Sequence, residues 1–275
     1  MVSALACFPT LILVLLGFSS CKEEESRGLT GVDYHFINRT GDYMWADNLS
    51  VQKEIIDLVG KVTEKTNYNA LPNNASFKLA DYALYINTCN AGYDKTRLEP
   101  SEYKDENFSP YKLPVQRLLQ DENALEPDPI IVNQLRQHFD KGPSGLRSNG
   151  GFYVILYVIE YRTTPIKSIS VYFSEDLLGV KNGEPLNHLL NASLYSRESS
   201  PFIITGAKKV IWSTEKVFPL AKYLAYNPMA PTELVMRFRE GVKLTEPVTG
   251  KFTVTMEPVS GKLITATTKT ITLTP

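Results

Sequence analysis

The sequence lacks the short motifs by which nucleotide-binding and hydrolytic enzymes are usually found. It has no GxGxxG segment, no Walker-type phosphate loop and no GxSxG turn, so nucleotide binding and serine hydrolysis have no starting point. The histidines His35, His138 and His188 stand far apart, without the spacing that brings zinc ligands together. We therefore predict surface or half-buried histidines, and no metal, cofactor or catalytic residue.

Cysteine is scarce, and the few that occur have separate explanations. Cys7 and Cys21 fall in or next to an apolar N-terminal segment, which leaves Cys89 alone in the rest of the chain. An intrachain disulfide is therefore excluded in a chain that has lost Cys7 by cleavage and whose Cys21 thiol is used for lipid. Cys89 ends the apolar stretch 85–89, with no histidine nearby in sequence to activate a nucleophile, so we predict a buried, inert thiol.

An excess of charge of either sign is also missing. The sequence has 29 Lys and Arg against 30 Asp and Glu, and its formal net charge is -1 at pH 7. Proteins that bind nucleic acid through its phosphates usually carry a clustered basic surface, whereas the basic residues here are scattered. We predict no nucleic-acid partner.

The N-terminal segment 1–20 contains no Asp, Glu, Lys or Arg, and residues 4–18 are nearly all apolar. This run is shorter than the roughly 20 apolar residues that a spanning helix needs, and Pro9 interrupts it. We interpret residues 1–20 as a signal peptide. A plain secretory signal cut near Ser20 and an uncleaved membrane anchor are the alternatives.

The end of this segment, Leu16-Gly17-Phe18-Ser19-Ser20-Cys21, resembles a bacterial lipobox. The resemblance implies cleavage before Cys21 and acylation of that residue. Each buried methylene contributes about 0.8 kcal/mol, so several acyl chains on one cysteine would hold the protein firmly in a membrane. The following Lys22, Glu23, Glu24 and Glu25 resemble the surface-export signal of Bacteroidetes-type lipoproteins, which implies the outer face of the outer membrane. Residues 21–31 then form an acidic tether.

The remaining sequence predicts a mainly β protein with helical segments in its N-terminal half. Apolar positions at helical spacing predict a helix over 51–65, and Asp128-Pro129 predicts the start of another. Residues 115–125 predict a short helix, and residues 92–111 a long loop. Strands are predicted at 77–88, at 152–162, around Ile169 to Phe173, and in a closing hairpin of 252–257 with 262–273. Because both faces of 152–162 are apolar, we expect a central strand.

These patterns divide the chain into a mixed helix and strand region, 32–145, and an antiparallel β-sandwich of immunoglobulin-like type, 146–275, which residues 77–90 can join. From Thr164 onward the order of motifs is similar to an uncharacterised family of Bacteroidetes surface lipoproteins. The matching residues are Gly183, Leu186, Asn187, Gly261 and the segment 268–271. This resemblance implies a location and a fold class, but no chemistry.

Aromatic residues are the best candidates for a binding site. Exposed flat rings stack on sugars and anchor protein partners, and we expect Tyr43 and Trp45, in a polar stretch, to make such contacts. Trp212 lies in a strand-like context and is expected in the core. Glu160, near the end of an apolar strand, is expected to emerge into solvent.

The favoured hypothesis is a non-catalytic surface lipoprotein that binds an extracellular glycan or protein. The alternatives are a structural accessory subunit of an outer-membrane or envelope assembly, and a carbohydrate-active hydrolase. A hydrolase would need two carboxylates about 5–10 Å apart in a groove.

Overall fold

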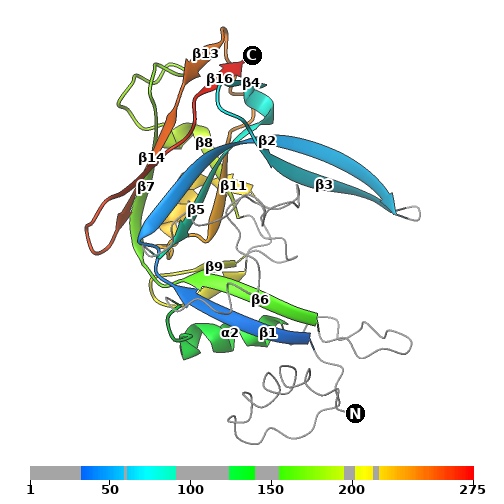
Figure 1. Cartoon of the computed structure of the whole chain (residues 1–275), viewed down its shortest axis with the longest axis vertical. Helices are drawn as coiled ribbons and strands as arrows, with labels where there is room; N and C mark the ends of the chain where they lie inside the picture. Colours follow the sequence, from blue (N-terminus) through cyan, green and yellow to red (C-terminus); the bar gives the residue numbers. More distant parts are fainter. Residues whose placement is uncertain (1–31, 59–60, 91–123, 140–154, 195–201, 213–216) are drawn as a thin grey trace, which may run out of the picture.

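The structure is a computed structural model that describes residues 32–58, 61–90, 124–139, 155–194, 202–212 and 217–275 (Figure 1). The predicted signal peptide, Cys21, the export residues Lys22 to Glu25 and the predicted loop at 92–111 lie outside these ranges, as does most of the predicted helix at 115–125. Within them, neither helix has the length and apolar content of a membrane span.

The largest element is a six-stranded sheet in which each strand runs antiparallel to its neighbours. It combines early and late parts of the chain, because residues 82–89 pair with 43–50 on one side and with 233–236 on the other. Its strands, in spatial order, are β11 (Val217–Pro219), β8 (Leu190–Leu194), β12 (Glu233–Phe238), β5 (Tyr82–Cys89), β2 (Tyr43–Leu58) and β3 (Lys61–Ala70).

Two three-stranded sheets accompany it. The first is antiparallel and has the order β15 (Ile264–Thr267), β14 (Phe252–Pro258), β7 (Ile166–Phe173). The second has the order β13 (Val248–Gly250), β16 (Ile271–Thr274), β4 (Ala75–Lys78), and its β16–β4 pair is parallel. Short 3-10 turns, η1 (Leu79–Asp81) and η4 (Asn187–Leu189), lead into β5 and β8.

The main hydrophobic core is shared by the six-stranded sheet and the β15-β14-β7 sheet. Alternation along β14 makes one face fully buried, and that face carries Phe252, Val254 and Met256. Tyr82 of β5 stacks on Phe252, with ring centroids 5.3 Å apart. Burial of apolar surface from two sheets in one layer supplies the main driving force for this part of the fold.

A second core lies under the parallel pair β1 (Val32–Arg39) and β6 (Ile155–Arg162). Helix α2 (Pro129–Phe139) buries Ile131 and Leu135 against it, as Figure 1 shows below the pair. The hairpin β9 (Phe202–Ile204) and β10 (Val210–Trp212) completes this core. The predicted helix start is confirmed, because the Asp128 carboxylate accepts hydrogen bonds from the N–H groups of Ile130 and Ile131.

The helix predicted over 51–65 is wrong. That segment forms the end of β2 and the start of β3, which pair antiparallel from Leu49↔Ala70 to Leu58↔Lys61. Apolar residues four and three apart imitated a helical face, but the segment is rich in Val, Ile and Thr, whose branched side chains favour strands. Pairing with β5 over Tyr43–Ser50 then decides the outcome in favour of the sheet.

Two further predictions need correction. Strand β6 is not central: among the described strands it pairs only with β1, and its apolar character reflects packing against α2. The strand predicted over 262–273 is interrupted after β15. The Thr268 hydroxyl accepts a hydrogen bond from the Phe252 N–H, and β16 then pairs in a different sheet. Strand β11 leads directly into the short helix α3 (Leu220–Ala225).

Candidate functional site

The aromatic residues expected to bind a ligand differ in exposure. Tyr43 is 44% exposed, as expected, but Trp45 is only 8% exposed, so the expectation of an exposed tryptophan is wrong. Trp45 lies well inside β2 and packs in a third hydrophobic cluster with Leu49, Val51 and Tyr85 on one face of the six-stranded sheet. The prediction took the segment for a polar loop, whereas it is a strand in which Met44 and Ala46 pack on the main core and Trp45 packs on the opposite face.

Trp45 nevertheless packs against the exposed ring of Tyr43. The two rings meet edge to face, with centroids 5.4 Å apart and planes at 67°. They sit on the same face of β2, two residues apart, and Tyr43 lies opposite Cys89 of β5 in the ladder. A buried ring therefore fixes the position of an exposed one, which lowers the conformational entropy that a contact to Tyr43 would cost.

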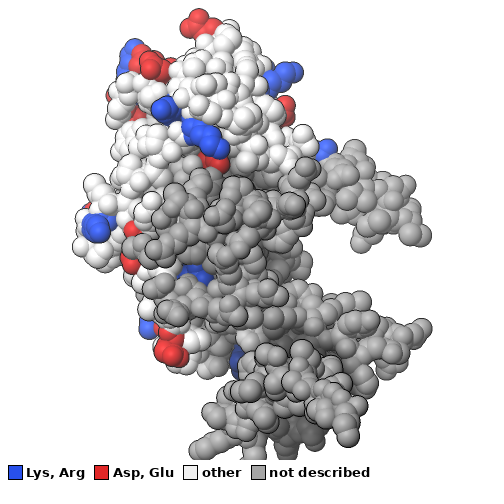
Figure 2. Space-filling view, in the orientation of Figure 1, with Lys and Arg blue, Asp and Glu red and all other residues white. Residues whose placement is uncertain are grey.

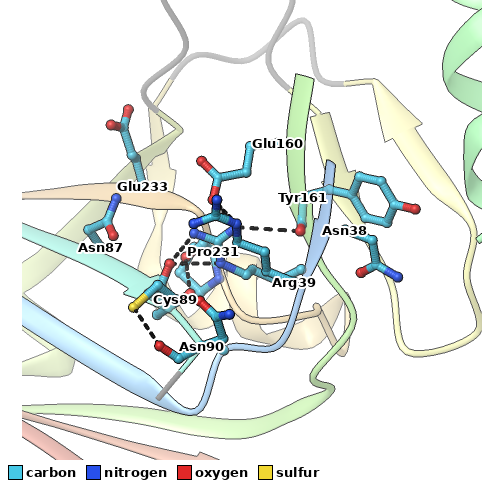
Figure 3. Close-up of polar contacts among 12 residues, drawn as sticks. Asn38, Arg39, Asn87, Cys89, Asn90, Glu160, Tyr161, Pro231 and Glu233 are labelled. Carbon is cyan, nitrogen blue, oxygen red and sulfur yellow. Dashed lines mark hydrogen bonds and ion pairs between the residues drawn. The ribbon is translucent and has the colours of Figure 1, made fainter. Parts of the chain in front are cut away.

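Immediately before Tyr43, a buried ion cluster joins the β1–β6 pair to the six-stranded sheet (Figure 3). Arg39 and Arg162 lie opposite each other in the parallel register, and each is only 2% exposed. The carboxylate of Glu160 approaches both: its Oε1 is 2.7 Å from Nη1 of Arg162 and 3.5 Å from Nε of Arg39. We call Arg39, Thr88, Glu160 and Arg162 the junction cluster.

The cluster reaches the larger sheet through the backbone of Thr88, near the end of β5. Nε of Arg162 donates a 2.7 Å hydrogen bond to the Thr88 carbonyl oxygen, and Nη2 donates a second bond to the same atom. The Thr88 hydroxyl donates in turn to the carbonyl of Pro231, just before β12. A guanidinium group suits this position, since its planar set of donors can serve a carboxylate and a carbonyl at once.

The expectation for Glu160 is therefore wrong. Its side chain is 20% exposed and is committed to ion pairs with two buried arginines, rather than emerging into solvent. No local sequence signal marked this partnership, because Arg39 and Arg162 end two separate strands and only the pairing of β1 with β6 brings them to one carboxylate.

A second carboxylate lies near this cluster in the sheet. Glu233 faces Asn87 across the β12–β5 ladder (Figure 3). Its Oε1 accepts a 3.0 Å hydrogen bond from the Tyr85 hydroxyl. The amide of Asn87 contacts the same hydroxyl at 3.4 Å. The two carboxylates thus each bind partners within the fold, Glu160 through ion pairs and Glu233 through the Tyr85 hydroxyl.

Burial raises the pKa of two tyrosines that line the two cores. Burial raises the pKa of Tyr161, whose hydroxyl accepts a hydrogen bond from the Asp128 N–H. Burial, together with the charge of Asp47, raises the pKa of Tyr82 well above the ordinary value. Both phenols therefore stay protonated to a higher pH than an exposed tyrosine does.

The other singled-out residues fall in different places. Cys89 is buried, as predicted, and its Sγ donates to the Asn90 carbonyl. His35 and His138 are half-buried and His188 is exposed, also as predicted. Trp212 is half-buried rather than in the core, and it stacks on His138 with centroids 3.5 Å apart. Within the described ranges, no three His, Cys, Asp or Glu residues gather in a way that could hold a metal ion.

On the face shown in Figure 2, basic and acidic side chains of the described residues are interspersed, without a broad patch of one sign. Comparisons of the chain with protein-family models, with curated proteins and with solved structures found no match. The site is therefore interpreted from its own geometry.

Proposed function

We propose that this protein is a lipid-anchored protein of the outer-membrane surface that binds an extracellular glycan or protein without chemistry. The observation that carries the binding part is the exposed ring of Tyr43, held edge to face by the buried Trp45. An aromatic ring presented rigidly at the surface gives a large contact area at a small entropic cost. We take Tyr43 as the contact residue and Trp45 as its support.

The non-catalytic part of the proposal rests on the two carboxylates. Glu160 lies between two guanidinium groups, and Glu233 accepts the Tyr85 hydroxyl. A glycoside hydrolase needs one carboxyl group to donate a proton and a second to act as base or nucleophile. Both carboxylates are engaged by partners within the fold, which supports binding over hydrolysis.

The anchor and the fold family belong to the same proposal. The sequence 16–21 supports acylation of Cys21, and Lys22 to Glu25 support export to the outer face. The shared core of the six-stranded and β15-β14-β7 sheets supports an immunoglobulin-like sandwich. Membership of an uncharacterised family of Bacteroidetes surface lipoproteins accords with these features.

The binding proposal is tested with an array of immobilised extracellular polysaccharides and matrix proteins, probed with the full chain in detergent. We expect at least one specific signal, reduced about tenfold by Tyr43→Ala, the loss expected for an anchoring aromatic. Tyr172→Ala removes a half-buried tyrosine from β7 and should leave the signal unchanged. Equal binding by the two variants, or no binding to any spot, would refute the proposal.

The anchor is tested separately by intact mass analysis of the protein from native membranes. We expect a chain that starts at Cys21 and carries acyl groups, and a Cys21→Ala form that leaves the membrane fraction. An unmodified thiol at Cys21 would remove the anchor from the proposal but leave the Tyr43 test untouched.

One observation favours the accessory-subunit alternative. The β2–β3 hairpin continues past the end of β5 as a two-stranded ribbon that projects from the body in Figure 1. A projecting ribbon is suited to contact another protein.

A further inference from the structure

Most of the strongly exposed apolar side chains of this protein belong to two neighbouring parts of the fold. Among the described residues six large hydrophobic side chains are exposed, and four of them lie there. Val259 and Leu263, 67% and 60% exposed, flank the turn between β14 and β15. Leu125 and Ile130, 43% and 56% exposed, flank the start of α2. We call these four residues the apolar rim, because single exposed apolar residues are common but a group of them is not.

Contacts through the turn between β9 and β10 connect the two halves of the apolar rim. The Val259 N–H donates to the carbonyl of Pro165, whose Cβ lies 3.7 Å from the place of an added Cβ at Gly206 in that turn. Lys208 of the same turn pairs at 2.8 Å with Asp128, the cap of α2. In Figure 1 the β14–β15 turn and the start of α2 accordingly lie on the same side, at the left of the view. The rim therefore belongs to one side of the molecule.

Lysines surround the apolar rim. Lys262 in the β14–β15 turn and Lys209 in the β9–β10 turn are exposed, and neither has an acidic partner within the described ranges. Lys208 and Lys167 are neutralised by ion pairs, and Glu126 is an exposed acid of the same region. A small excess of positive charge remains. Exposed aliphatic side chains with lysines around them are typical of surfaces that lie at a lipid–water interface.

The proposed lipid anchor brings a membrane within reach of the apolar rim. Ten residues, 22–31, separate Cys21 from Val32, and an extended chain of this length spans at most about 35 Å. Strand β1 has 8 residues and is roughly 26 Å long, and near its far end the Asn38 carbonyl accepts a hydrogen bond from the Leu125 N–H. The tether is therefore long enough for the side that carries the rim to face the bilayer.

We propose that the apolar rim rests on the lipid surface of the membrane that holds the anchor, with Val259, Leu263 and Ile130 in the headgroup region. The inference rests on the proposed acylation of Cys21, since a contact of so few side chains needs a tether that keeps their effective concentration high. Two such contacts and one anchor would fix the orientation of the fold. Tyr43 lies on the face of β2 opposite to the main core that β14 shares, so it would stay available to a ligand.

A lipid surface suits the apolar rim better than a second copy of the chain does. The excess lysine charge is attracted by lipid phosphates, whereas the same charge on a second rim would repel it. The side chains of Val259 and Leu263 also stand at a turn, where a deformable lipid surface accommodates them without a matching pocket. The proposal therefore commits to lipid.

The test uses the full acylated chain in vesicles of phosphatidylcholine and phosphatidylglycerol. A nitroxide label is attached to Leu263→Cys or to Ile130→Cys, and Val217→Cys, at a 51% exposed valine of β11, is the control. The native Cys89 is buried. We expect both rim labels to be shielded from a water-soluble relaxing agent and open to oxygen, and the control label to show the reverse. Purified vesicles contain only lipid and this chain, so a third protein cannot supply the shielding.

Flotation of the same vesicles separates the failure of the anchor from the failure of the rim. A chain that does not float would refute the anchor and this contact together. A chain that floats with its rim labels as open to water as the control label would overturn the rim contact alone. Broadening of the signal from the label at Leu263→Cys that disappears on dilution with unlabelled chain would place a second copy on the rim, and would overturn the proposal too.

A second set of variants tests whether both halves of the rim meet one surface. Replacing Val259 and Leu263 together with serine should remove the shielding of the label at Ile130→Cys, because the contact is shared. Val217→Ser should leave that shielding in place. Replacing phosphatidylglycerol with phosphatidylcholine should reduce it, since the lysines lose their anionic partners. Shielding that survives the double serine substitution would overturn the shared contact.

Discussion

Glu160 and Arg162 project from the same face of β6, two residues apart, and their Oε1 and Nη1 atoms are separated by 2.7 Å. This contact matters because Arg162 also holds the Thr88 carbonyl of the six-stranded sheet. One guanidinium group thus joins a carboxylate of the small parallel pair to the backbone of the large sheet.

Replacing Arg162 with methionine should therefore destabilise the whole protein. It leaves Glu160 without its nearest cation and the Thr88 carbonyl without its donors, and breaking a buried pair in this way costs about 3 kcal/mol. Chemical denaturation measures the change. The control is Lys167→Met, which breaks the exposed pair with Glu257 and should alter the free energy of unfolding by less than about 1 kcal/mol. Equal effects of the two substitutions would contradict a structural role for the cluster.

Gly41 should not tolerate a side chain. A Cβ atom at this position would lie 2.5 Å from Cβ of Ala230, in the tight connection between β1 and β2. We expect Gly41→Ala to destabilise the fold by about 1–3 kcal/mol through overpacking. At Gly206 the nearest atom to an added Cβ would be 3.5 Å away, so Gly206→Ala is the matched control and should be tolerated. Melting temperatures of both variants settle the comparison.

The cap of α2 predicts a pH dependence of stability. A hydrogen bond from Lys208, followed by those from the N–H groups of Ile130 and Ile131, lowers the pKa of Asp128. A carboxyl group whose pKa is lower in the folded state stabilises the protein above its unfolded pKa, and this contribution is lost as the pH falls through the folded pKa. Urea unfolding should show the loss below about pH 4, the ordinary aspartate range.

Asp128→Asn is the informative variant for that titration. Asparagine caps a helix about as well as aspartate but does not titrate, so the variant should lose less stability than the natural protein between neutral and acidic pH. Parallel curves for the two proteins over this range would show that Asp128 does not contribute.

Asn187 should be needed both for stability and for covering the backbone groups on the outer edge of β7. Asn187→Ala removes two hydrogen bonds to the backbone of β7, a loss of about 2 kcal/mol. It also uncovers a strand edge, so we expect increased self-association by size-exclusion chromatography. Asn182→Ala, at an exposed asparagine in the preceding loop, should change neither quantity.

The stacked pair His138 and Trp212 offers a spectroscopic check of the second core. Their planes are 11° apart, and Phe202 packs on the indole with centroids 5.3 Å away. In a Trp45→Phe background, His138→Ala should expose one face of the indole and move its emission to longer wavelength. His188→Ala, at an exposed histidine, should leave the emission unchanged; a shift there, or none with His138→Ala, would contradict the described packing.

Local patterns predicted the elements that depend on local physics. The start of α2 follows from one capping aspartate and one proline, and β7 follows from simple alternation of apolar residues. The segment 51–65 failed because the spacing of its apolar residues is compatible with both a helix and a strand. Its first half continues the strand that pairs with residues 82–89 through Tyr43–Ser50, and that long-range pairing is not contained in a short window.

The candidate site was predictable only in part. The exposure of Tyr43 followed from its polar surroundings, whereas the burial of Trp45 depends on which strands flank β2. Arg39 and Arg162 stand more than a hundred residues apart, and only the parallel register of β1 with β6 brings them to one carboxylate. An arginine at the end of a strand does not by itself predict an ion pair with a residue of another strand.

The parallel pairing of β1 with β6 also has a mechanical consequence. A pull on the chain ahead of Val32 would act along β1 and load its whole ladder from Val32 to Arg39 in shear, so that the bonds share the force instead of unzipping one after another. The buried guanidinium groups of Arg39 and Arg162 lie at the far end of this ladder, where their ion pairs with Glu160 would hold the two strands together. In a protein anchored through its N-terminus, as proposed above, drag on the folded part would therefore load the β1–β6 ladder in shear.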